Sequence, residues 1–125
     1  MKPDKRGRTF KGVISLVILK CLWNEPSYGY QLEKEIDRCI GQKLSNGEIY
    51  SILRNMEIRG LVKNKSVREA EGNRKYYEIS SEGKKHLTDQ VKNMEYAITS
   101  FEEIIKFVHS VTEKEREDSI SGAPS

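Results

Sequence analysis

The hydrophobic and polar positions at the start of the chain predict two helices. An almost unbroken apolar run over residues 10–23 is too long for a strand and lacks a polar face, so it predicts a helix buried on most sides. Apolar residues then recur every four positions from Leu32 to Ile40, ahead of Gly41, which is typical of a helix that ends in a left-handed residue. Ser27 is placed to cap the start of this second helix.

A capping-box pattern predicts where a third helix starts. The stretch Ser45-Asn46-Gly47-Glu48 has the Ser-x-x-Glu spacing, in which the hydroxyl and the carboxylate satisfy backbone N–H groups of the first helical turn. Apolar residues then follow at helical spacing, before Gly60 ends the run, and form one stripe: Ile49, Ile52, Leu53 and Met56.

Two strand-like segments come next, Leu61–Arg68 and Arg74–Ile79. The residues between them, 69–73, have the composition of a hairpin loop and include a glycine. Tyr76 and Tyr77 fall on opposite faces of the second strand, so one of them is expected to pack inward.

Residues 84–111 carry a sustained heptad pattern. A helix of this length would measure roughly 42 Å, and it cannot bury an apolar stripe on so small a body, so we expect a dimerisation helix that pairs with a second copy. Residues 112–125 are charged and then small, which predicts a disordered tail. The apolar residues of the heptad pattern, called the seam below, are Leu87, Val91, Met94, Ile98, Phe101, Ile105 and Val108.

Charge is distributed unevenly along the chain. The 125 residues have a net charge of only +3. Residues 1–79, however, hold 16 Lys and Arg against 10 Asp and Glu, whereas residues 80–125 hold 6 against 9. The body is therefore basic and the C-terminal helix and tail are acidic. Residues 1–9, interrupted by Pro3 and Gly7, are predicted to form a basic N-terminal arm.

Composition and spacing exclude several classes of protein. The length suits one domain. Cys21 and Cys39 have no further ligand at metal spacing, so we expect no disulfide scaffold, no metal site and no cofactor. No nucleophile, base and orienting group can be assembled, so we expect no catalytic site. The apolar stretches are too short to span a membrane, and we expect a cytoplasmic protein without a membrane partner.

The order of elements predicts the fold class. Three helices and a small β-hairpin make it mainly α with a minor β part (α+β), arranged as a winged helix-turn-helix over residues 10–83 and followed by the dimerisation helix. In this layout the third helix enters the major groove of double-stranded DNA and the hairpin touches the flanking backbone. Cations on the arm, the third helix and the hairpin agree with that partner.

The candidate DNA contacts lie on the third helix and the hairpin. Residues at the start of a helix can hold phosphate oxygens with backbone amides, and Tyr50 can reach a phosphate or a base edge or else pack on the hairpin. Arg54 suits guanine and Asn55 suits adenine. Two cations at the expected tip of the hairpin suit backbone phosphates. The full set is Ser45, Asn46, Tyr50, Ser51, Arg54, Asn55, Arg74 and Lys75.

Three separated stretches resemble the PadR-like transcriptional regulators in order and spacing: Pro26–Leu32, Leu44–Leu61 and Arg74–Gly83. The resemblance covers about residues 12–83. It implies a homodimeric winged-helix repressor with a C-terminal dimerisation helix and an operator of two inverted half-sites. It also implies that Tyr50 lies beside DNA and that Tyr77 is the tyrosine that packs inward.

Three features depart from the family's pattern. Glu48 stands where threonine is common, and Ser51 stands where proline is common, so the operator sequence cannot be carried over. A subgroup of similar regulators binds flat aromatic drugs through a tryptophan on the C-terminal helix. The only tryptophan here, Trp23, ends the first helix, so that stacking mode is not expected.

The sequence therefore predicts a sequence-specific DNA-binding transcriptional regulator, acting as a homodimeric repressor on an inverted-repeat operator. Two alternatives stay open. One is a ligand-sensing repressor with a small-molecule effector, of unknown identity, held at the dimer interface near Tyr96 and Phe101. The other is a winged-helix module that docks another protein.

Overall fold

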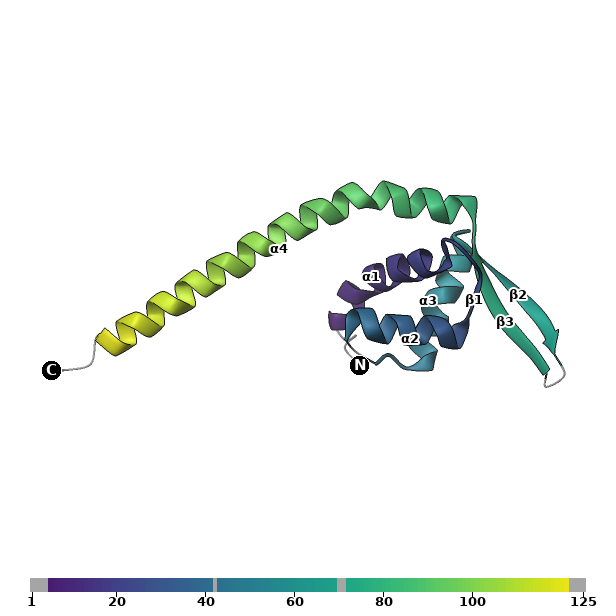
Figure 1. Cartoon of the computed structure of the whole chain (residues 1–125), viewed down its shortest axis with the longest axis horizontal. Helices are drawn as coiled ribbons and strands as arrows, with labels where there is room; N and C mark the ends of the chain where they lie inside the picture. The colour runs from purple at the N-terminus through teal and green to yellow at the C-terminus, as the bar shows by residue number, and fades with distance from the viewer. Residues whose placement is uncertain (1–4, 42, 70–71, 122–125) are drawn as a thin grey trace. The chain divides into compact units, whose positions relative to one another are not determined.

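The computed structural model describes residues 5–41, 43–69 and 72–121 of the chain. The chain divides into two compact units, residues 1–88 and 89–125. The first unit holds the winged-helix elements and the start of the last helix, and the second holds the rest of that helix (Figure 1). In chain order the elements are α1 (Lys5–Leu22), β1 (Ser27–Tyr28), α2 (Gly29–Ile40), α3 (Asn46–Ile58), β2 (Val62–Glu69), β3 (Gly72–Ile79) and α4 (Ser81–Ser121).

Helix α1 begins earlier than the apolar run indicated. Residues 5–9, assigned to a basic arm, form its first turns, so the arm prediction is wrong for them. Lysine and arginine are good helix formers, and the single Gly7 costs only about 1 kcal/mol in a helix interior, too little to stop it. Residues 1–4 of the predicted arm lie outside the described residues.

A short strand precedes α2, and the sequence pattern did not predict it. Ser27, expected as the helix cap, instead pairs with Tyr77 of β3, and Tyr28 pairs with Tyr76. Tyr28 is the N-cap residue, and its backbone N–H donates to Gln31 Oε1 at 2.9 Å. The antiparallel sheet therefore has the order β1-β3-β2 rather than being a bare hairpin.

The signals at the ends of α2 and α3 are confirmed. Gly41 closes α2 in the left-handed conformation, with φ 71°. Ser45 caps α3, and its Oγ accepts a hydrogen bond from the Glu48 backbone N–H at 3.2 Å. Only this half of the predicted capping box forms among the described residues, because the hydrogen bond from Ser45 N–H to the Glu48 carboxylate is absent there.

Strands β2 and β3 are longer at the tip than predicted. Their ladder runs from Val62 opposite Ile79 to Glu69 opposite Gly72, so the loop shrinks to residues 70–71, which lie outside the described residues. Arg74 and Lys75, expected at the tip, lie within β3 opposite Val67 and Ser66. Composition marked the turn, but it could not tell a five-residue loop from a shorter one.

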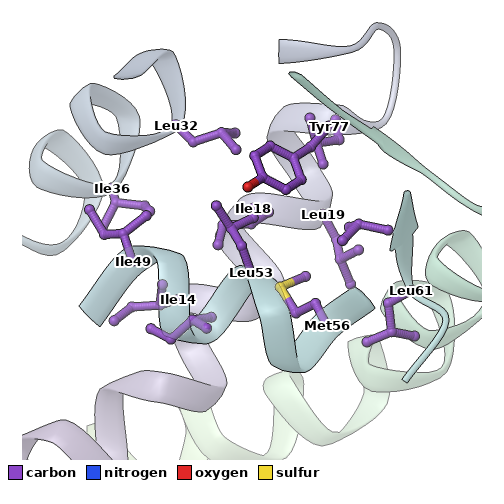
Figure 2. Close-up of a cluster of buried hydrophobic side chains, with 13 residues drawn as sticks. Ile14, Ile18, Leu19, Leu32, Ile36, Ile49, Leu53, Met56, Leu61 and Tyr77 are labelled. Carbon is purple, nitrogen blue, oxygen red and sulfur yellow. The ribbon is translucent and has the colours of Figure 1, made fainter. Parts of the chain in front are cut away.

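One apolar core joins the helices of the first unit to the sheet (Figure 2). The four apolar residues predicted on the third helix are all buried, and each fully buried side chain of this size contributes about 1.5–3 kcal/mol. Tyr77 is only 3% exposed, which confirms that it packs inward. The core residues are Ile14, Ile18, Leu19, Leu22, Leu32, Ile36, Ile49, Ile52, Leu53, Met56, Leu61, Val62 and Tyr77.

The first turn of α4 is fixed to the core unit. Ser80 Oγ accepts from the Gly83 backbone N–H at 3.0 Å and donates toward two carbonyl oxygens, Gly60 O at 2.6 Å and Leu61 O at 3.0 Å. The Lys84 Nζ lies 5.4 Å from the centre of the Trp23 ring. Leu87, predicted in the dimerisation seam, packs against the core of its own chain.

Helix α4 continues to Ser121, well past the predicted end at Val111. The disordered tail predicted from Thr112 is therefore wrong as far as residue 121, and residues 122–125 lie outside the described part of the chain. The charged composition of this segment suggested disorder, yet Glu, Lys and Arg are good helix formers and extend a helix that has already started.

Candidate nucleic-acid interface

Helix α3 turns one face away from the core. At 3.6 residues per turn, Ser51 and Arg54 lie near the centre of this outward face, opposite the buried stripe. Tyr50 and Asn55 lie on its two flanks. Ile58, which sequence reasoning passed over, is also outward and 77% exposed.

Tyr50 faces a hollow of about 520 Å³, called the tyrosine pocket below. It lies where the β1–α2 junction, α3 and β3 meet, which brings two predicted hairpin contacts together with one from α3. Its lining residues are Tyr28, Gly29, Tyr30, Tyr50, Arg74 and Lys75.

A second hollow of about 350 Å³ shares Tyr50 and Lys75 with the tyrosine pocket and continues along α3 and the hairpin. Arg54 lines it, together with Glu57, Asn64 and the edge of Tyr77. Burial first, and then the Glu57 carboxylate, raise the pKa of the Tyr77 hydroxyl above its ordinary value. Four predicted contacts, Tyr50, Arg54, Arg74 and Lys75, therefore meet in two adjoining hollows.

The other predicted contacts do not join this group. Ser51 and Asn55 line a separate hollow of about 210 Å³ with Ser15 of α1, on the opposite flank of α3. Ser45 and Asn46 lie at the start of α3, where the Ser45 hydroxyl is engaged in capping. None of these four lines either of the two hollows described above.

Tyr28 and Tyr30 also line the tyrosine pocket, and neither is among the predicted contacts. Tyr30 is 48% exposed. Its ring stacks on that of Tyr28, with centroids 5.9 Å apart and an interplanar angle of 9°. The Arg74 guanidinium lies over both rings, at 5.7 and 5.9 Å from their centroids. The available signal was the sequence Tyr28-Gly29-Tyr30, in which two tyrosines lie two positions apart.

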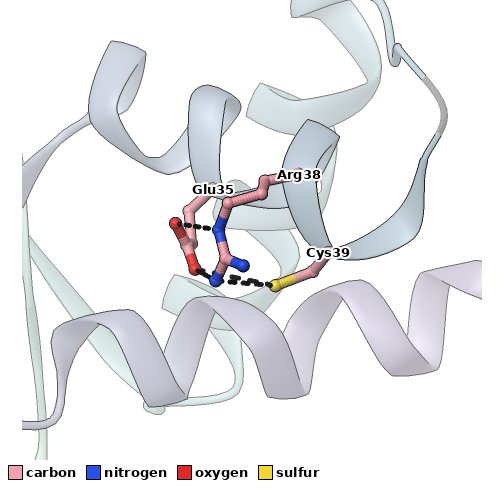
Figure 3. Close-up of polar contacts among 3 residues, drawn as sticks. All are labelled: Glu35, Arg38 and Cys39. Carbon is pink, nitrogen blue, oxygen red and sulfur yellow. Dashed lines mark hydrogen bonds and ion pairs between the residues drawn. The ribbon is translucent and has the colours of Figure 1, made fainter.

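Some cations of the first unit are paired with acids. Lys65 Nζ lies 3.1 Å from Glu78 Oε1 across the hairpin, and this hydrogen bond raises the pKa of Lys65. Arg38 on α2 donates from Nε and Nη2 to the two carboxylate oxygens of Glu35 (Figure 3). Its Nη2 also lies 3.6 Å from Cys39 Sγ, whereas the Glu35 contact is the dominant one for the carboxyl. The hydrogen bond from Arg38 lowers the pKa of the Glu35 carboxyl.

The part of α4 in the second unit presents large apolar side chains to solvent. The seam residues Val91, Ile98, Phe101, Ile105 and Val108 are exposed in the single chain. A further row, called the second stripe below, lies roughly 120° around the helix from the seam. It was not predicted, and its members are Tyr96, Ile104, Phe107 and Val111.

Other kinds of site are not found in the described part of the chain. It contains no cluster of three or more His, Cys, Asp or Glu side chains that could hold a metal ion. Among the same residues, no helix is long and apolar enough to cross a bilayer. Burial, helped by the Glu35 carboxylate, raises the pKa of the Cys21 thiol, which disfavours its reactive thiolate form.

Comparison with known proteins agrees with this geometry. The model of the transcriptional regulator PadR-like family matches residues 18–89. A structure assigned as a transcriptional regulator from Thermoplasma acidophilum is 34% identical, with TM-score 0.74, covering 79% of this chain and 96% of that one. A PadR-like regulator from Bacillus cereus is 26% identical, with TM-score 0.67, covering 78% and 96%.

A PadR family regulator from Clostridium difficile is also 26% identical, with TM-score 0.64, covering 74% of this chain and 97% of that one. No curated protein matches the sequence. The predicted winged-helix fold is confirmed, and the family is one of DNA-binding regulators rather than enzymes. With its family model matched from the last turns of α1 into α4, the chain belongs to the PadR-like family of transcriptional regulators.

Proposed function

We propose that the protein is a sequence-specific repressor that binds an inverted-repeat operator as a homodimer. The observation that carries the proposal is the meeting of Tyr50 and Arg54 from α3 with Arg74 and Lys75 from β3 in two adjoining hollows. To contact one stretch of DNA, two kinds of side chain must lie side by side. One is a helix side chain that reads a base edge, and the other is a strand cation that binds the flanking phosphate.

The outward face of α3 supports reading in the major groove. Arg54 has the fork geometry that pairs with guanine O6 and N7, and it lies near the centre of this face. Ser51 and Asn55 lie on the side toward α1 and would read bases on that side of the groove. We assign Tyr50, Arg74 and Lys75 to the backbone, because their hollow extends away from α3 toward the sheet.

The exposed seam supports the homodimer. Monomeric proteins rarely present a contiguous apolar patch of this length, and a heptad pattern is suited to pairing with a second helix. The second stripe widens the apolar surface beyond one seam, so each α4 in the dimer would contact more than one helix. Two α3 helices in successive major grooves lie about 34 Å apart along the duplex.

Selection of bound fragments from random duplex DNA tests the proposal. The enriched sequences should contain two inverted half-sites, and binding to them should weaken steeply as salt rises, since each neutralised phosphate adds about 0.9 to the salt slope. Transcription in vitro from a promoter that overlaps the selected site should fall when the protein is added. No enrichment, or an affinity that does not change with salt, would contradict DNA binding and favour the protein-docking alternative.

Charge reversal separates DNA binding from assembly. The double variant Arg74→Glu/Lys75→Glu should lose DNA while sedimenting as the same dimer, because both residues lie in the first unit on β3. The matched control is Lys63→Glu/Lys65→Glu on β2, outside both hollows. Equal loss of affinity in the two double variants would show a general charge effect instead of a defined contact.

A further inference from the structure

We propose that the tyrosine pocket binds one phosphodiester group of the DNA backbone, with Arg74 as the ligand-binding cation and Tyr28 and Tyr30 as the residues that position it. This inference rests on the proposed DNA-binding function and names a subsite within it. It places a contact to the DNA backbone where four elements meet, rather than at the hairpin tip: β1, the start of α2, α3 and β3.

The charges that line the tyrosine pocket select an anion. Arg74 and Lys75 contribute two positive charges, and none of the described residues that line the pocket is acidic. The adjoining hollow also contains cations but includes Glu57, which disfavours a phosphate there. Tyrosine hydroxyls add neutral donors of the kind that often accompany arginine at DNA phosphates. The chemistry therefore favours a phosphate group in the tyrosine pocket over its neighbour.

The two stacked tyrosine rings hold Arg74 in place. A guanidinium over aromatic rings is attracted to their faces, and both centroids lie within 6 Å of it. Tyr28 is itself fixed by the edge of the Tyr76 ring, at 6.1 Å, and by its place in β1. Arginine binds phosphate through a planar fork of N–H groups, so fixing that plane before DNA arrives reduces the ordering needed on binding.

Gly29 sets the depth of the tyrosine pocket beside Tyr50. A Cβ atom on residue 29 would lie 3.0 Å from the Tyr50 hydroxyl oxygen and 3.4 Å from its Cε1. Any side chain there would displace the hydroxyl or occupy part of the hollow. The absence of a side chain thus lets the Tyr50 hydroxyl lie against the start of α2, next to the two cations.

A scan of neutralised phosphates tests the inference directly. Operator duplexes from the random-pool selection are made with a single uncharged methylphosphonate at each backbone position in turn. Wild-type protein should lose about tenfold or more in affinity at one position in each half-site. Arg74→Gln should bind the unmodified duplex more weakly, with a salt slope smaller by about 0.9 for each protomer, and should lose no further affinity at that same position.

Two further variants distinguish positioning from general stability. Tyr30→Leu removes one of the rings that position Arg74, so it should weaken binding. It keeps every charge, so the salt slope and the melting temperature should stay unchanged. Lys63→Gln is a matched cation control that should show no coupling to the scanned position. Gly29→Ala should weaken binding with little change in melting temperature, because the atom that must move is the end of a flexible side chain.

The outcomes separate this inference from the function on which it rests. Failure of the wild-type protein to bind any duplex overturns both. Tight DNA binding in which Arg74→Gln and every single methylphosphonate act additively overturns only the phosphate subsite. Inorganic phosphate that binds the wild-type protein and displaces the operator at constant ionic strength, with no coupling between Arg74 and any backbone position, would assign the tyrosine pocket to a free phosphate and overturn the DNA assignment.

Discussion

The carbonyl oxygen of Leu61 lies where a side chain on Gly83 would begin. A Cβ atom at residue 83 would be 2.2 Å from this oxygen and 2.8 Å from Ile79 Cγ1. The first turn of α4 therefore packs directly on the segment between α3 and β2, and backbone atoms cannot move aside as a flexible side chain can. Residue 83 must therefore be a glycine because of this close packing, and not because of the backbone conformation of the helix.

Gly83→Ala should lower the free energy of unfolding by about 1–3 kcal/mol, the usual cost of overpacking a closely packed site. Urea unfolding followed by circular dichroism measures the change. Gly12→Ala in α1 is the matched control, since a Cβ there meets no atom within 4 Å. It should stabilise the helix by about 0.5–1 kcal/mol, so loss of stability in both variants would refute the packing argument.

Ser45→Ala should cost about 1 kcal/mol, because it leaves the Glu48 backbone N–H without its acceptor at the start of α3. Ser45→Asp retains an acceptor and places a negative charge at the helix N-terminus, so its stability should stay within a few tenths of a kcal/mol of the wild type. Thermal unfolding of both variants provides the comparison. If both variants were destabilised equally, the Ser45 hydroxyl would not stabilise the protein as a helix cap.

Ile98→Asp should convert the proposed dimer to monomers, since a carboxylate in an apolar interface has no compensating partner. Sedimentation velocity is the measurement. Thr99→Asp, the adjacent residue on the helix and outside the seam and the second stripe, should leave the sedimentation coefficient unchanged. Phe107→Asp probes the second stripe, and an effect equal to that of Ile98→Asp would assign both faces of α4 to the interface.

Lys84→Gln should cost about 0.5–1 kcal/mol, because it removes the cation from the face of Trp23. Trp23 is the only tryptophan in the sequence, so its fluorescence reports on this contact without labelling. The emission maximum should shift in Lys84→Gln and stay unchanged in the neighbouring control Lys85→Gln. A shift of the same size in both would indicate a general charge effect.

Arg38→Gln should raise the pKa of Glu35, because the Arg38 hydrogen bond is the main cause of its depression below the ordinary value of 4.5. A carboxyl with a lower pKa in the folded state stabilises the fold above its ordinary pKa and loses that contribution as pH falls through the folded value. NMR titration of the Glu35 carboxyl measures the pKa. The control variant Lys34→Gln should leave the pKa of Glu35 unchanged.

Much of the core could be predicted from periodicity. The stripe from Ile49 to Met56 is buried as expected, since apolar residues at i, i+3, i+4 and i+7 of a capped helix share one face. Periodicity did not show a second contact of Leu87. This residue lies at a heptad position and also packs against the core of its own chain, a contact that no local pattern encodes.

The part of the candidate site that the sequence missed depends on tertiary pairing. Strand β1 has only two residues, Ser27 and Tyr28, which are too few to show the alternation that predicts a strand. They form a strand because they pair with β3. That pairing places Tyr28 and Tyr30 next to Arg74. The positive charge of Arg74 and Lys75 could be read from the sequence, whereas the position of the two tyrosine rings beside Arg74 could not.

The hydrogen bonds between Ser80 and Leu61 close the hairpin at its base. The Ser80 N–H donates to Leu61 O at 3.0 Å, and the Ser80 hydroxyl donates to the same oxygen. Residues 61–80 thus leave and return to one fixed point. Matched insertions in the two strands near residues 70–71 would lengthen the hairpin without moving the joint between α3 and α4. Under the proposed function, evolution can therefore change the reach of the hairpin along a duplex while the apolar core stays as it is.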